Sequence, residues 1–330
     1  MECLRRLLRL MYFLGILSIT YNSRKGIYES YRHSKLQFAV LLSSAMLGAS
    51  YVIYRSPIES ILYRPAQLMF DFTIYIVNCL AFCAICLVFP LAIYRGRQHL
   101  ADALNALLQN DLLLRQASGK VLEYKQPKSF EMFVLWNSTV FTVLLALAFM
   151  ILYKQNEGFL QFYVGVCIYL FVGIALDWTF GLCGLIILIG VAQLTAATDH
   201  PQHDKECLQN MDQHFGRFCI LYERIVNVVR PRLSAYSGLL VTFYCPLLVF
   251  QCAVKTLDSL FPASDLVNLN DRMLFAFGIL WLVNDIKKFV VFLIISEILK
   301  QKVSYLLQLL FSIGEVDKRY KNHTRINNHS

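Results

Sequence analysis

The chain of 330 residues is 57% hydrophobic and only 16% charged, and it carries a net charge of +9. This composition, concentrated in long apolar blocks, excludes most classes of soluble enzyme. The positive charge is spread over separate connectors and is not gathered on one face, so it does not indicate a nucleic-acid-binding surface.

The first segment of the chain, residues 1–35, begins with a basic and apolar stretch. Arg5 and Arg6 precede the apolar residues 7–17, an order that is typical of a secretory signal peptide. The following residues 18–22 contain no convincing small-residue cleavage site. We therefore expect a retained amphipathic helix on the cytosolic side.

Six apolar blocks follow, each long enough to cross a bilayer as a helix of about 20 residues. Backbone groups inside lipid must be paired within their own segment, so blocks of this length are predicted to be helices. The predicted class is an all-α polytopic membrane protein with six transmembrane helices and long cytosolic helical extensions. The blocks are residues 36–54, 68–94, 132–153, 159–194, 235–254 and 273–298.

The connectors predict the orientation. The N-terminal segment, the second–third connector, the fourth–fifth connector and the C-terminal tail together hold 24 Lys and Arg residues. The two short alternate connectors hold three, Arg55, Arg64 and Lys154, with Lys255 at a block edge. Cytoplasmic loops collect basic residues. Both termini are therefore predicted to be cytosolic, with a membrane domain over residues 36–299 and a cytosolic tail over residues 300–330.

Two of the inside connectors have helical apolar spacing, residues 99–114 and residues 208–229. One interpretation is that transmembrane helices continue past the membrane and pack together in the cytosol. The other is that these segments are interfacial helices on the inner leaflet.

Polar residues inside the apolar blocks are costly and mark candidate functional positions. The candidates here are Asp177, Asp285 and Lys288. Asp285 and Lys288 are three residues apart and can pair on one helical face. They predict a water-lined path or binding cavity, or else an internal ion pair with the lysine snorkelling to the inner interface.

Aromatic residues collect at the predicted outer ends of the blocks, where converging helices would form a pocket for a small organic ligand. The alternative is an aromatic belt at the membrane interface. The candidate ligand-binding residues are Asp71, Tyr75, Tyr153, Tyr163, Tyr169 and Trp281.

Motifs for catalysis, nucleotide binding and metal ligation are missing from the sequence. All seven histidines lie in connectors or tails. The sequence therefore predicts a protein that is not an enzyme and that uses neither a cofactor nor a metal.

The opening Leu7-Leu-Arg-Leu-Met-Tyr-Phe-Leu-Gly-Ile-Leu-Ser-Ile-Thr-Tyr-Asn-Ser-Arg-Lys-Gly26 resembles the N-terminal stretch of insect gustatory receptors, especially those of flies. The resemblance implies a plasma-membrane taste receptor with seven membrane helices and a cytosolic N-terminus. It also implies a ligand-gated cation channel of four subunits, homo- or hetero-oligomeric with other gustatory receptor subunits. The family's ligand pocket lies among the outer halves of the second to sixth helices, and its small organic tastants and surrounding lipid are the implied partners.

The family's seventh helix lines the pore and ends in a Thr-Tyr, apolar, Gln-Phe signature. The chain lacks this signature, and the apolar stretch at residues 304–313 is too short to span a bilayer. We therefore expect a truncated member, an alternative product or a receptor-like protein without a pore helix. The functional alternatives are a non-conducting regulatory or assembly subunit and, from another class, a secondary transporter.

Overall fold

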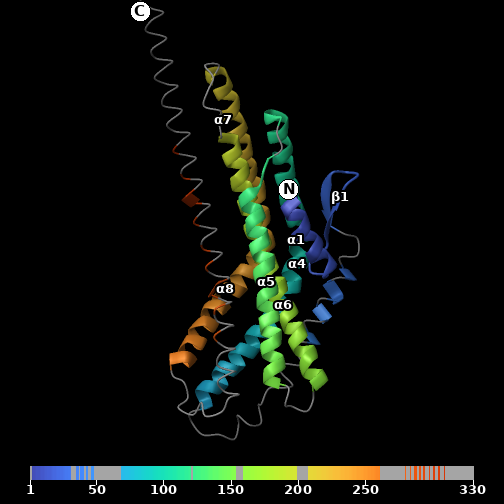
Figure 1. Ribbon diagram of the computed structural model, residues 1–330, viewed down its shortest axis with the longest axis vertical. Helices are drawn as coiled ribbons and strands as arrows, with labels where there is room; N and C mark the ends of the chain where they lie inside the picture. The colour runs from blue at the N-terminus through green and yellow to red at the C-terminus, as the bar shows by residue number, and fades with distance from the viewer. Residues whose placement is uncertain are drawn as a thin grey trace, which may run out of the picture.

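The computed structural model describes residues 2–30, 68–119, 122–153, 159–198 and 207–260, together with single positions in the segments 35–47 and 279–308. It is a bundle of long helices with one small hairpin near the N-terminus (Figure 1). The predicted helical architecture is confirmed for the described residues, whereas the two strands of the hairpin were not predicted. The elements in chain order are α1 (Glu2–Phe13), β1 (Ile19–Asn22), β2 (Ile27–Ser30), α4 (Leu68–Ser118), α5 (Lys125–Tyr153), α6 (Phe159–Thr198), α7 (Cys207–Arg224), η1 (Ile225–Val229) and α8 (Arg230–Leu260).

The predicted apolar blocks coincide with helices. Residues 68–94, 132–153, 159–194 and 235–254 lie wholly within α4, α5, α6 and α8, and the described positions of the first and sixth blocks are also helical. Among the described residues, one stretch, Gly173–Ala197, is both long and apolar enough to cross a bilayer, and most of it is buried in the bundle. The number of membrane crossings therefore stays a prediction.

Helices α4 and α8 are longer than the blocks that predict them. α4 runs on through residues 99–114 without a break, and residues 208–229 form α7 and η1, which lead directly into α8. The helices are thus continuous through these segments, and whether the extensions lie in the cytosol or on the inner leaflet stays a prediction. Pro90 lies inside α4, where it removes one backbone donor, and the helix changes direction along its length (Figure 1).

The N-terminal segment folds onto the bundle. In α1 the residues Leu4, Leu7 and Met11 are fully buried, while the arginines between them are exposed, as the amphipathic pattern predicts. α1 packs against α5 and α6, and the hairpin packs against α4. The side chain of Asn105 in α4 accepts a bond from Tyr28 N–H (2.7 Å) and donates one to Tyr28 C=O (2.9 Å). The Asn105 side chain therefore satisfies both backbone groups of Tyr28, as a neighbouring strand would do.

Two glycines set the closest helix crossings. A Cβ on Gly96 of α4 would lie 2.8 Å from Tyr236 Cα and 2.6 Å from its Cδ2, and a Cβ on Gly181 of α6 would lie 2.6 Å from Val134 Cγ1 of α5. Small residues at such positions let neighbouring helices approach closely, which increases the van der Waals contact between them.

We expect Gly96→Ala to separate α4 from α8, since the added methyl group overlaps the backbone of Tyr236. Overpacking of this kind costs about 1–3 kcal/mol. The melting temperature should therefore fall. It is measured on the purified protein in detergent, by heating samples and following the loss of the folded peak in size-exclusion chromatography. Gly173→Ala is the matched control, because a Cβ there meets no atom within 4 Å. Equal melting temperatures for the two variants would contradict a tight crossing at Gly96.

Candidate functional site

The ends of the long helices fall into two groups. The N-terminal end of α4, the C-terminal ends of α5 and α8 and the N-terminal end of α6 lie toward the bottom of Figure 1. The C-terminal end of α4 and helix α7 lie toward the top. The predicted outer residues whose backbone is described thus belong to helix ends on one side of the bundle, and the described parts of the second–third and fourth–fifth connectors belong to the other side.

For the residues of the predicted ligand site, the structure describes at most the backbone. Asp71 and Tyr75 lie in the first turns of α4, Tyr153 is the last residue of α5, and Tyr163 and Tyr169 lie in the first half of α6. Their side chains, and all of Trp281, lie outside the described residues. Whether these side chains converge on one pocket therefore stays a prediction.

The predicted intramembrane polar residues are described in part. Asp177 is half-buried in α6, beside the buried Trp178 and Thr179. Asp285 and Lys288 lie outside the described residues. The neighbouring Lys287 places its Nζ 5.2 Å from the ring centroid of Phe141 in α5, a cation–π distance. The sixth block therefore passes close to α5 at this level.

A polar cluster that the sequence did not reveal lies at the other side of the bundle, among α4, α6 and the start of α5. Tyr124 Oη donates to Asp111 Oδ1 (2.9 Å), and Gln193 Nε2 donates both to Leu107 C=O (2.8 Å) and to Tyr124 Oη (3.2 Å). Arg115 Nη2 lies 3.0 Å from Asp111 Oδ2. Buried polar groups require such partners because an unpaired one costs about 1–3 kcal/mol.

The electrostatics of this cluster keep the phenol neutral. Burial raises the pKa of Tyr124 above its usual range, the neighbouring Asp111 raises it further, and the bond from Gln193 lowers it in part. The phenol therefore remains a hydrogen-bond donor at any physiological pH. Asp111 is almost fully buried and accepts bonds from both Tyr124 and Arg115.

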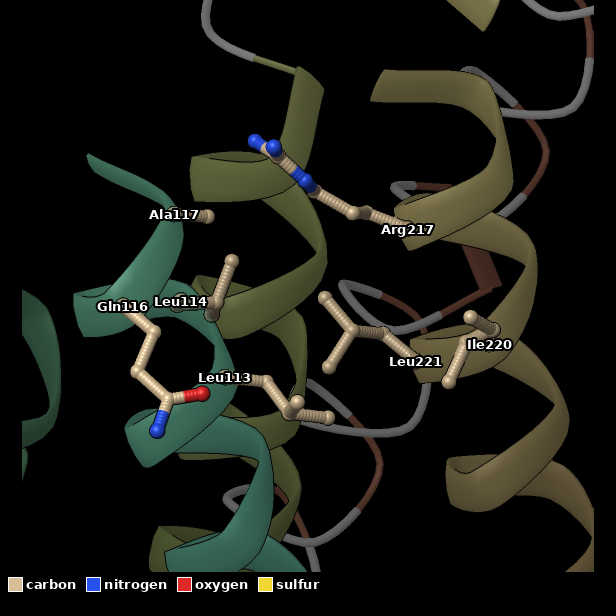
Figure 2. A pocket seen from close by; sticks show the side chains of 7 residues that line it. All are labelled: Leu113, Leu114, Gln116, Ala117, Arg217, Ile220 and Leu221. Carbon is tan, nitrogen blue, oxygen red and sulfur yellow. The ribbon is translucent and has the colours of Figure 1, made fainter. Parts of the chain in front are cut away.

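Helix α7 is joined to this cluster at its C-terminal end. Arg224 Nη1 donates to Asn110 Oδ1 over 3.2 Å, and the Asn110 side chain is fully buried. Next to the cluster lies an open apolar pocket of about 270 Å³ between the last turns of α4 and α7 (Figure 2). Its lining residues are Leu113, Leu114, Gln116, Ala117, Arg217, Ile220 and Leu221. The Arg217 side chain stands above the apolar residues in this view.

A second buried carboxylate lies where α1 meets α5. Glu131 is almost fully buried, and burial raises its pKa, while the nearby cations Arg6 of α1 and Lys128 lower it in part. Neither carboxylate oxygen has a hydrogen-bond partner among the described residues. The sequence carries no signal for this position beyond a single acid before an apolar block.

We expect Tyr124→Phe to destabilise the protein by about 1–3 kcal/mol, because Asp111 and Gln193 each lose a partner in a buried site. The measurement is the melting temperature in detergent. Tyr222→Phe on α7 is the control, since its half-buried ring stacks on Phe218 with centroids 6.0 Å apart and this contact survives the change. A Tyr124→Phe protein as stable as the control would show that the cluster contributes nothing to the fold.

Comparison with known proteins assigns the chain to a family. No curated protein matches it, and no solved structure matches it. The family described as 7tm Chemosensory receptor matches residues 4–327, which is nearly the whole sequence. This is a family of membrane receptors and not of enzymes, in agreement with the apolar blocks and with the missing catalytic motifs. The chain therefore belongs to the 7tm chemosensory receptor family.

Proposed function

We propose that this chemosensory receptor is a gustatory-type subunit of a ligand-gated cation channel in the plasma membrane. A small organic compound binds among aromatic side chains at the outer ends of the helices and shifts a closed–open equilibrium through its higher affinity for the open state. The subunit works in a homo- or hetero-oligomer with other subunits of the family. The family match over residues 4–327 is the observation that carries this proposal.

Contacts near the predicted inner boundary support cytosolic termini. The bond between Tyr28 and Asn105 holds the N-terminal hairpin against the part of α4 that follows the second block. The ring of Phe38, at the start of the first block, lies 4.6 Å from that of Tyr94, at the end of the second block. A first block that begins where the second one ends is what two successive crossings in opposite directions require.

The side chains next to Tyr94 are of the types that collect at a membrane boundary. Arg97 places its guanidinium 3.9 Å from the centroid of Tyr94 and donates to the Tyr94 carbonyl. Tyrosine and arginine are enriched at interfaces, where a ring meets the headgroups and a charge reaches water. The basic connectors that follow the second block and precede the first would then share the cytosolic side.

Epitope tags at Met1 and Ser330 should be detected only after the cells are permeabilised, because the basic connectors retain both termini in the cytosol. A tag inserted after Ser264, in the predicted outer connector, is the positive control for labelling of intact cells. Labelling of either terminal tag at the surface of intact cells would contradict the proposed orientation.

The ligand site is tested with Tyr75→Ala, Tyr163→Ala and Trp281→Ala, each of which removes a predicted aromatic contact. Calcium influx is measured in cells that co-express a full-length gustatory receptor, over a panel of sugars, amino acids and alkaloids. For an active compound, the half-maximal concentration should rise about tenfold, which corresponds to about 1.4 kcal/mol.

Tyr54→Ala, at the edge of the first block, is the matched control, and all variants are compared at equal surface expression. Equal responses from all four variants would favour an aromatic belt over a binding pocket.

A further inference from the structure

One turn between α7 and α8 departs from α-helical geometry. Residues Ile225–Val229 form the π-helical turn η1, and the N–H of Arg230 donates to the carbonyl of Ile225, five residues earlier. The helix is otherwise continuous from Cys207 to Leu260. A single π turn of this kind places one extra residue in an α-helix, and such turns are rare and collect at functional sites.

The extra residue decides which side chains face α4. In an α-helix each residue advances by about 100°. Tyr236 follows Arg224 by twelve positions and Arg232 follows it by eight. In an unbroken α-helix these residues would lie about 120° and about 80° away from Arg224. With one residue absorbed by the π turn, both lie within about 20° of Arg224.

All three of these residues contact α4. Arg224 donates to Asn110 (3.2 Å), Arg232 pairs with Asp102 (3.2 Å), and Tyr236 packs on Gly96. The contacts run in opposite order along the two helices, so they form one antiparallel seam. The π turn is therefore what allows a single seam to continue from α7 into α8.

The anchors on the two sides of η1 differ in kind. On the α7 side, Asn110 is fully buried, and Phe218 and Leu221 pack in an apolar cluster with α4 and α6. On the α8 side, Tyr236 is fully buried against Gly96, whereas the Arg232 side chain is 44% exposed and contributes only a weak ion pair. A rotation of α8 therefore has to break the Tyr236 contact as well as the ion pair.

Pro231 opposes closure of the turn into α geometry. An α-helical bond at this position would run from the N–H of residue 231 to the carbonyl of Asn227, and proline has no N–H and places its ring against that carbonyl. Ile225 of η1 lies opposite Gly190 of α6, where a Cβ on the glycine would make an ordinary van der Waals contact with its Cδ1 at 3.7 Å. Proline, seam and packing thus hold a turn that is intrinsically unfavourable.

We propose that η1 is a rotational switch between α7 and α8. In its π form it directs Tyr236 at Gly96. In its α form α8 is rotated by about 100° relative to α7, which carries Tyr236 and Arg232 away from α4 while Arg224 stays on Asn110. A side-chain tip about 5–6 Å from the helix axis moves by about 8 Å in this rotation.

Deletion of Asn227, an exposed residue of η1, removes the extra residue of the π turn. Arg224, Arg232 and Tyr236 then still lie on the same side of the helix, facing α4. The deletion is made in the Pro231→Ala background, because the proline ring would clash with a carbonyl of the closed turn, and we expect it to fold with a melting temperature close to that of Pro231→Ala. Deletion of the exposed Ser234, between Arg232 and Tyr236, is the matched control and should abolish folding, because it turns Tyr236 by about 100° away from α4. Equal loss of folding in both deletions would overturn the phase argument.

The switch itself is tested by the distance between spin labels at Leu87 of α4 and Phe243 of α8, both exposed. The labels are attached to non-natural residues, since the chain has ten cysteines. Pro231→Ala should add a second distance population shifted by up to about 8 Å, and deletion of Asn227 in the same background should abolish it. A single unchanged distance in the parent protein and in Pro231→Ala would show a static turn and overturn the proposal.

Discussion

The close crossing of α4 and α8 at Gly96 is the constraint on which the arrangement of the bundle depends. A side chain there would overlap the backbone of Tyr236, so the two helices touch at this level only because position 96 has no Cβ. The same device recurs where Gly181 of α6 meets Val134 of α5. Close approach of the helices increases the van der Waals attraction between them. Gly96 and Gly181 thus allow two helix pairs to come close together.

The polar cluster at the end of the bundle fixes the register of the packed helices, that is, which residues lie opposite each other. Two of its bonds join residues far apart in the chain, since Gln193 of α6 reaches Leu107 of α4 and Arg224 of α7 reaches Asn110. A helix that slid by one residue would leave a buried amide or carboxylate without its partner, which costs more than the bond contributes. Glycine contacts therefore set how close the helices lie, and the polar bonds set which residues meet.

Sequence patterns predicted the elements that depend on local periodicity. The apolar blocks gave the cores of α4, α5, α6 and α8, and the alternation of leucine and arginine gave α1. The hairpin was missed because each strand has only four residues and its pairing is completed by Asn105, which lies 77 positions after Tyr28. The π turn was missed because nothing in the apolar residues of η1 sets them apart from an ordinary α-helix. Tyr124 and Gln193 were missed because their partners come from three separate segments.

The described contacts converge on one short stretch of α4. Between Gly96 and Asp111 this helix receives Tyr236 and Arg232 from α8, Tyr28 from the hairpin, Gln193 from α6 and Arg224 from α7. These sixteen residues span about 22 Å, at about 1.5 Å per residue. Asn105 lies between the positions that bind α8 and α7, so a rotation of α8 changes the contacts on one side of the hairpin and leaves those on the other side in place. The N-terminal segment is therefore joined to a part of α4 whose contacts a movement of α8 would change.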